Sequence, residues 1–184
     1  MDIVKIETPL KDEVIKELEI GMQVLLSGII YTARDVVHQK LVDLISNNKP
    51  LPFNPEGSVI YYVEPSPAKP GYVIGIAVPT TNYRMDPFAL AGVKGMIGKG
   101  QRSNEVIESI KKNVAVYFGA TDGGAALISK SIIEARGIAF EELGPEAVRE
   151  FRVKDMPLIV INDCYGNDLY IEGQKNGHKF SFDF

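Results

Sequence analysis

The stretch that organises this chain spans residues 78–103 and reads VPTTNYRMDPFALAGVKGMIGKGQRS. An apolar run, residues 72–78, predicts a strand that leads into it. Asp86 and Pro87 predict the start of a helix, because aspartate is a favoured N-cap and proline is tolerated at the first helical position. The stretch is therefore expected to form a strand, a turn and a helix.

Three polar side chains, those of Thr80, Thr81 and Arg84, fall between the predicted strand and the helix start. Free backbone N–H groups and the helix dipole favour an anion at such a position. A basic loop from Lys99 to Arg102 follows and is placed to fold over the same mouth. We expect a site for a small anion, a carboxylate. The alternative for the same pattern is an ordinary strand–turn–helix junction with a solvated surface arginine.

Composition is that of one globular domain covering residues 1–184, with 45% hydrophobic and 24% charged residues. A net charge of −4 gives a nucleic-acid role no electrostatic support. No apolar run approaches the length of a membrane span, and the acidic N-terminal segment does not resemble a signal peptide. We expect a soluble cytoplasmic protein with no membrane and no nucleic-acid partner.

Metal ligands are scarce in the sequence. Cys164 is the only cysteine, which excludes an internal disulfide and a self-contained iron–sulfur or zinc–thiolate site. The only histidines are His38 and His178. We expect this chain to bind no metal by itself, so any metal chemistry would have to come from a partner.

The first third of the chain predicts two strands and a helix. The strands cover residues 2–7 and 22–31, and Ser27-Gly28 interrupts the second, which indicates a bulge or a close backbone approach. Thr32 and Asp35 have the spacing of a capping box at the helix start, with Asp in place of the usual Glu or Gln. The buried stripe of this helix is expected to comprise Val36, Val37, Leu41, Leu44 and Ile45.

Arg34 and His38 lie one helical turn apart at the start of this helix and so share a face. The plainer alternative is an exposed first-turn arginine and a histidine that packs locally.

The rest of the chain alternates further strands with short helices. Ser103 is expected to cap a helix that runs to about Lys112. The glycine-rich segment 119–124 either cradles an anion or packs tightly on a sheet. The predicted strands cover residues 59–63, 114–118, 132–139, 148–153, 158–162 and 169–171, and a helix covers residues 125–130. Connections near Pro65 and Gly166 look too short for crossovers, which predicts an α/β fold with a mixed sheet and several helices.

Five segments of the chain carry a combined signal: SGIIYTARDVVHQKL (27–41), PTTNYRMD (79–86), GKGQRS (98–103), YFGATDGGAALIS (117–129) and INDCYGND (161–168). Taken together and in this order, they resemble the β subunit of class I, iron–sulfur-dependent fumarate hydratases. The same architecture forms the C-terminal domain of the single-chain enzymes and the β subunit of L-tartrate dehydratase.

The resemblance implies a swivelling β/β/α domain and a partner α subunit that carries a [4Fe–4S] cluster on three cysteines. The assembly would be α2β2, or a β homodimer when the chain is isolated. Arg34 and Arg84 match the arginines that bind substrate carboxylates, with Thr81 beside them. Thr80 matches the threonine proposed to take part in proton transfer, and Lys99 matches a lysine that reaches the substrate.

His38, Asp86 and Arg102 belong to the same motifs, and we expect supporting roles for them. The family's Ala-Gly before the second arginine is Asn82-Tyr83 here, which bears on pocket size and therefore on substrate identity. The expected reaction is the reversible dehydration of (S)-malate to fumarate, with this chain inactive alone. The alternatives are the β subunit of L-tartrate dehydratase, or a non-catalytic module of the same fold that binds a dicarboxylate.

Overall fold

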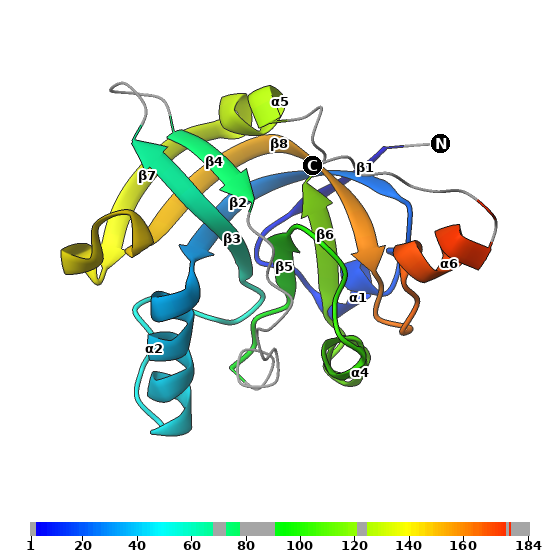
Figure 1. The fold of residues 1–184 in the computed structure, drawn as a ribbon, viewed down its shortest axis with the longest axis horizontal. Coiled ribbons are helices and arrows are strands. Elements are labelled where there is room, and N and C mark those ends of the chain that lie inside the picture. The colour runs from blue at the N-terminus through cyan, green and yellow to red at the C-terminus, as the bar shows by residue number, and fades with distance from the viewer. Residues whose placement is uncertain (1–2, 68–72, 78–90, 121–124, 176, 178–184) are drawn as a thin grey trace.

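A computed structural model describes residues 3–67, 73–77, 91–120, 125–175 and 177 (Figure 1). Mixed α/β architecture is confirmed. In chain order the elements are β1 (Val4–Glu7), α1 (Asp12–Ile15), β2 (Gln23–Ala33), α2 (Asp35–Ser46), β3 (Val59–Pro67), β4 (Val73–Ala77), β5 (Gly95–Gly98), α4 (Asn104–Lys112), β6 (Val116–Ala120), α5 (Ala125–Ser131), β7 (Ile132–Ala139), the 3₁₀ helix η2 (Glu141–Glu146), β8 (Val148–Asn162) and α6 (Leu169–Lys175). No helix within these described ranges is long and apolar enough to cross a membrane.

The sheet closes on itself like a small barrel. Its strand order is β1-β2-β3-β5-β6-β8-β7, and β2 also pairs with β8, so that β2, β3, β5, β6 and β8 form a ring. β2, β3, β5 and β6 are parallel neighbours, whereas β8 runs antiparallel to both β2 and β6. The predicted mixed sheet is therefore confirmed, and the swivelling β/β/α assignment stays a prediction.

Buried side chains fall into two clusters, one on each face of the closed sheet. Because successive side chains of a strand point to opposite faces, alternate residues such as Tyr61 and Tyr62 separate into different clusters. The interior cluster includes Ile30, Phe118 and Phe151, each fully buried. The outer cluster includes side chains of α2 and α4, which lie in the lower part of Figure 1.

Gly28 forms the bulge expected in β2. The register with β8 shifts between Leu26 and Gly28, and Gly28 has a φ of +108°. A Cβ atom here would overlap Thr8 Oγ1 and lie 3.2 Å from the Thr8 backbone N and O. Only glycine therefore allows β1 to approach β2 so closely.

Gly28→Ala is expected to lower the free energy of unfolding by about 2–4 kcal/mol, because it adds both left-handed strain and an overlap. Gly144→Ala is the matched control, since Gly144 also has a positive φ (+57°) but nothing within 4 Å of its Cβ position. Urea unfolding of both variants measures the difference. Equal losses would show that the close approach of Thr8 contributes nothing.

Several element predictions are confirmed and others are wrong. Ser103 does cap α4, accepting a 3.4 Å hydrogen bond from Val106 N. The strands expected at 148–153 and 158–162 are one strand, β8, because Pro157 pairs with Leu25 and the chain bulges at Asp155 instead of ending. β5 was not predicted, and the strand expected at 169–171 is wrong.

Helix α6 begins where that last strand was expected. Asp168 Oδ1 accepts hydrogen bonds from Tyr170 N (2.8 Å) and Ile171 N (3.3 Å), which satisfies free N–H groups at the helix start. Asp163 also shapes this turn, since its carboxylate accepts from the backbone N–H groups of Tyr165 and Asn167. The aspartates of the INDCYGND segment therefore have structural partners.

Candidate active site

Arg34 and Lys99 lie at the same edge of the sheet. Ala33, the last residue of β2, pairs with Tyr62 of β3, and the register of Tyr61 with Ile97 places Tyr62 level with Gly98, the last residue of β5. Each basic residue therefore comes one position beyond its strand, with β3 between the two. At a strand spacing of about 4.8 Å, their backbones are roughly 10 Å apart.

Arg34 is held at the junction of β2 and α2. It is the N-cap residue of α2, with an extended backbone, and the residue is partly buried. The capping box expected from Thr32 and Asp35 is wrong, because Thr32 lies within β2 and its hydroxyl accepts a 3.1 Å hydrogen bond from Arg149 N. The strand continues through Thr32, so the helix starts two residues later than that pattern required.

His38 lies one turn into α2 and is 4% exposed. Its Nδ1 lies 3.4 Å from the hydroxyl of Tyr62, which is buried on β3. Burial raises the pKa of Tyr62 well above its ordinary value, and the positive charge of Arg102 opposes this shift. Tyr62 therefore stays protonated, and His38 packs inward against it instead of facing solvent, as the plainer alternative for this histidine requires. The supporting role of His38 stays a prediction.

Of the stripe expected on α2, Val37 and Leu41 are fully buried, but Val36 is 45% exposed. The face that α2 turns to the sheet is therefore the one that carries Val37, His38 and Leu41. His38 reaches Tyr62 from this face, which places a polar group among the apolar contacts.

Lys99 and Arg102 lie in the segment between β5 and α4. Arg102 is only 4% exposed, and its Nη2 donates hydrogen bonds to Tyr117 Oη (2.8 Å) and to the Lys99 carbonyl (3.4 Å). The guanidinium carbon lies 4.2 Å from the centre of the Tyr117 ring. Burial raises the pKa of Tyr117 to about 12, against the opposing charge and hydrogen bond of Arg102.

These contacts join His38 of segment 27–41 and Arg102 of segment 98–103 into one buried polar cluster with Tyr62 and Tyr117. Arg102 acts electrostatically on both Tyr62 and Tyr117, and Tyr62 in turn contacts His38. The cluster joins α2, β3, β6 and the segment after β5, next to the edge that carries Arg34 and Lys99. Four other predicted residues, Thr80, Thr81, Arg84 and Asp86, lie outside the described residues.

Tyr62 and Tyr117 are the residues that the sequence reasoning missed. The only sequence signal was a tyrosine within an otherwise apolar strand, since a buried phenol needs a partner for its hydroxyl. Gly119, on the same strand as Tyr117, favours the packing alternative for its segment. A Cβ atom there would lie 2.9 Å from the Ile161 side chain. Residues 121–124 of that segment lie outside the description.

The described residues offer no group of three or more His, Cys, Asp or Glu placed to hold a metal ion. Cys164 is buried, and its Sγ lies 3.9 Å from the Ile15 carbonyl oxygen. Desolvation, followed by the nearby charge of Asp163, raises the pKa of this thiol. Cys164 therefore has the surroundings of an unreactive core residue. With one cysteine in the sequence, this chain does not fit the ligand set of a cubane cluster.

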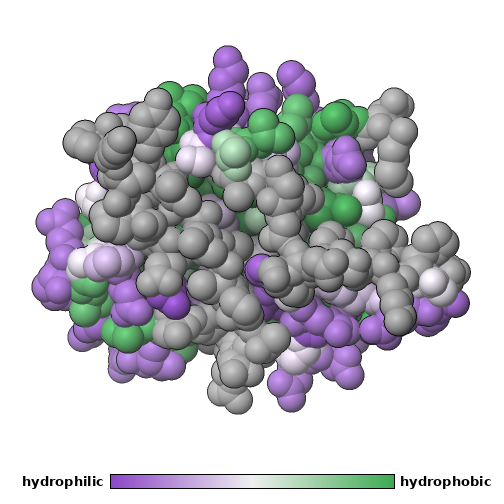
Figure 2. Space-filling view, turned by 45° about the horizontal axis from the view of Figure 1, so that its top comes forward, coloured by the Kyte–Doolittle hydropathy of each residue, from purple (hydrophilic) through white to green (hydrophobic). Residues whose placement is uncertain are grey.

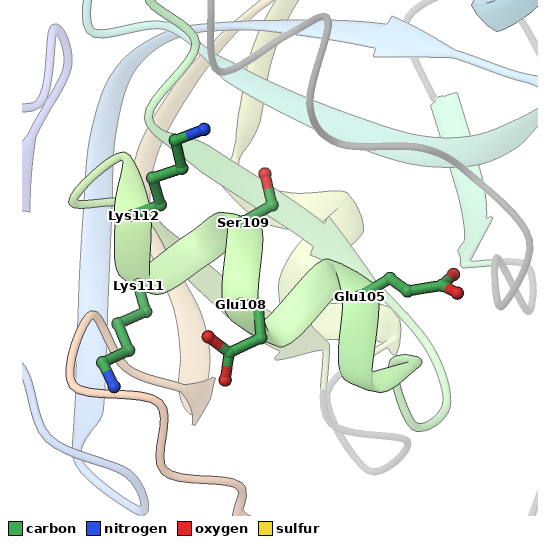
Figure 3. A pocket seen from close by; sticks show the side chains of 5 residues that line it. All are labelled: Glu105, Glu108, Ser109, Lys111 and Lys112. Atoms are coloured by element: carbon green, nitrogen blue, oxygen red, sulfur yellow. The ribbon is translucent and has the colours of Figure 1, made fainter.

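A surface hollow on α4 is lined by none of the candidate site residues. It has a volume of about 480 Å³ and is lined by Glu105, Glu108, Ser109, Lys111 and Lys112 (Figure 3). Its side chains come from one helix and diverge, and the two glutamates and two lysines cancel in charge. It has the features of a solvated helix surface. Figure 2 shows the face that comes forward when the top of Figure 1 is turned toward the viewer. Its larger hydrophobic areas lie in the upper half of the view, and hydrophilic residues lie along the rim.

Comparison with known proteins identifies the family of this chain. The family described as Fumarase C-terminus matches residues 1–173. A Methanocaldococcus jannaschii protein named "Putative L(+)-tartrate dehydratase subunit beta" is 36% identical over 171 residues, which cover 88% of each chain. Fumarate hydratase 2 of Leishmania major is 36% identical over 85% of this chain. The aerobic class I fumarate hydratase of Escherichia coli is 32% identical over 91% of it.

This chain belongs to the Fumarase C-terminus family, and its matched relatives are named as fumarate hydratases and as a tartrate dehydratase subunit. It spans 28% of the Leishmania enzyme and 32% of the E. coli enzyme, but most of the tartrate dehydratase subunit.

Proposed function

We propose that this chain is the β subunit of an iron–sulfur-dependent hydro-lyase that interconverts (S)-malate and fumarate. The observation that carries the proposal is the shared strand edge of Arg34 and Lys99, beside the buried Arg102 cluster, in a chain of this family. Its partner is an α subunit that holds a [4Fe–4S] cluster. The two chains form an α2β2 enzyme.

The charges of this edge suit a C4 dicarboxylate. The substrate carries two negative charges, and arginine forks match carboxylate geometry best, while lysine acts as a point charge. Arg34 and Lys99 are about two strand spacings apart, which leaves room for a four-carbon chain between their side chains. Arg84 is assigned to the second carboxylate by its motif.

Removal of a proton next to a carboxylate builds negative charge on that carboxylate in the transition state. Fixed cations in a pocket that excludes water stabilise this charge more than they stabilise the ground state. Thr80 is assigned to the proton transfer by its motif. A threonine hydroxyl is a poor base at its free pKa, so this role requires a cationic pocket or a coupled group. Arg102 and His38 support the pocket from the buried cluster.

In this proposal the [4Fe–4S] cluster is bound by the partner α subunit, because this chain has a single cysteine and that cysteine is buried in the core. This chain's share is to bind the carboxylates, to position the substrate and to help move the proton. An overall charge of −4 makes its cationic edge a local reversal of sign, which attracts a dianion.

L-Tartrate dehydration is the second candidate. It is favoured by the M. jannaschii relative, which matches this chain over 88% of both lengths and is named as a separate β subunit. A non-catalytic dicarboxylate-binding module is the third, but such a module has less need of several fixed cations. Ratios of kcat/KM for malate and L-tartrate, measured on the assembled enzyme, decide between the first two.

The isolated chain is expected to be colourless and to show no hydratase activity, because one cysteine cannot hold a cubane cluster. Co-expression with the α subunit should yield a brown complex that converts malate to fumarate. The reaction is measured by the ultraviolet absorbance of fumarate. The isolated α subunit, with its cluster reconstituted, serves as the control. Turnover of malate by this chain alone, free of metal, would contradict the proposal.

A further inference from the structure

The segment that carries Lys99 makes a sharp turn held by side chains from elsewhere in the fold. Gly100 has a φ of +90°, with nothing within 4 Å of the position of a Cβ atom. The turn therefore depends on the backbone freedom of glycine and not on local packing. Such a segment needs outside contacts to hold one conformation.

Tyr117 and Arg102 supply those contacts. The Tyr117 hydroxyl donates a 3.0 Å hydrogen bond to the Gly100 carbonyl and accepts a 2.8 Å hydrogen bond from Arg102 Nη2. The same nitrogen donates to the Lys99 carbonyl at 3.4 Å. Two consecutive carbonyls, those of Lys99 and Gly100, are thus bound by one stacked pair of side chains.

Tyr117 is anchored in a buried strand that is paired on both sides. Tyr117 is 1% exposed and lies in β6, paired with Met96 on one side and Asn162 on the other. Because burial raises its pKa to about 12, its hydroxyl keeps the proton that it donates to Gly100 throughout the physiological range. The hydrogen bonds from Tyr117 and Arg102 therefore hold the backbone at Lys99 and Gly100 at a fixed position.

We propose that Tyr117 is a positioning residue of the active site, which fixes the backbone of Lys99 through the Gly100 carbonyl and Arg102. The inference rests on the proposed function, in which Lys99 reaches the substrate. Fixed cations stabilise developing charge only if their geometry is set in advance. These hydrogen bonds fix the backbone carbonyls of Lys99 and Gly100 before the substrate binds.

Tyr117→Phe tests the proposal, since it keeps the ring and removes only the hydroxyl. In the assembled enzyme kcat/KM for malate should fall about tenfold, the effect of one well-placed hydrogen bond. Tyr165→Phe is the matched control, because it removes a 2.6 Å tyrosine–carbonyl hydrogen bond to Lys16 on an exposed loop. Its kcat/KM should stay within about twofold of the parent value.

A double-mutant cycle with Lys99→Ala separates positioning from a purely structural role. If Tyr117 acts through Lys99, Tyr117→Phe should change kcat/KM by less than about twofold in the Lys99→Ala background. A full tenfold loss in that background, or no loss in the parent, would overturn the inference. An unchanged kcat/KM in Lys99→Ala would instead overturn the proposed role of Lys99 itself.

Gly100→Ala keeps the inference testable if Tyr117→Phe fails to fold. This substitution leaves Tyr117 and Arg102 unchanged. It strains the backbone of the same turn, because alanine disfavours a positive φ, and the added Cβ atom meets no neighbour within 4 Å. The expected loss of kcat/KM should again vanish in the Lys99→Ala background, and persistence of the loss there would overturn the inference. Scanning calorimetry of every variant confirms that the folded protein is being compared.

Discussion

Arg34→Ala is expected to lower kcat/KM for malate in the assembled enzyme by roughly 10²- to 10⁴-fold. A bidentate arginine–carboxylate contact comprises two charge-assisted hydrogen bonds, each contributing about 1.5–3 kcal/mol. Its removal leaves a carboxylate unpaired in a pocket that excludes water. Arg34→Lys keeps the charge and loses the fork, so that variant should lose only about ten- to a hundredfold.

The position of Arg34 makes this test specific. The residue joins β2 to α2, and its backbone is set by the strand on one side and the helix on the other. Arg152→Ala is the control, since Arg152 is an arginine exposed on β8 that forms an ion pair with Glu134 at 3.4 Å. Steady-state kinetics should show no change for that control. An equally unchanged Arg34→Ala would refute the assignment of Arg34 to a carboxylate.

Phe118→Ala is expected to lower the free energy of unfolding by about 3–5 kcal/mol, the usual cost of a phenylalanine-sized cavity. Phe118 is fully buried in the interior cluster and lies on β6, where it pairs with Ile97 and Val160. The closed sheet surrounds this position, so its strands have little freedom to collapse into the cavity. For a chain of this length the melting temperature should fall by about 6–20 °C.

Leu127→Ala is the control for this prediction, because Leu127 is also a large apolar residue but is 56% exposed on α5. Its effect should stay within about 0.5 kcal/mol. Calorimetry on the isolated chain measures both changes and needs no activity. A loss below about 1 kcal/mol for Phe118→Ala would show that the interior of the sheet repacks readily.

Local patterns predicted those parts of the fold whose cause is local. The Ser27-Gly28 pair predicted the bulge of β2, and Ser103 predicted the start of α4. Both predictions are local, because backbone freedom and capping act within a few residues. The same reasoning failed at residues 169–171. A three-residue apolar run suits a strand or a helix, and Asp168 decided for the helix by capping it.

The candidate site divides in the same way. Arg34, His38, Lys99 and Arg102 were found from motifs in the sequence, and the comparison confirms the family those motifs indicate. That Arg34 and Lys99 share an edge depends on the order and direction of β2, β3 and β5, which no local pattern encodes. Their separation of about 65 positions in the chain is bridged only by strand pairing.

By itself, the sequence determined the family, the basic residues and the elements that begin with a local signal. Only the tertiary structure decided that β2 pairs with β8 to close the sheet, and that Tyr117 binds the carbonyl of Gly100. Both are contacts between residues distant in the chain, stabilised by burial and by hydrogen bonds that form only once the strands have assembled. A tyrosine in an apolar strand signals a need for a partner, but the partner is decided by the fold.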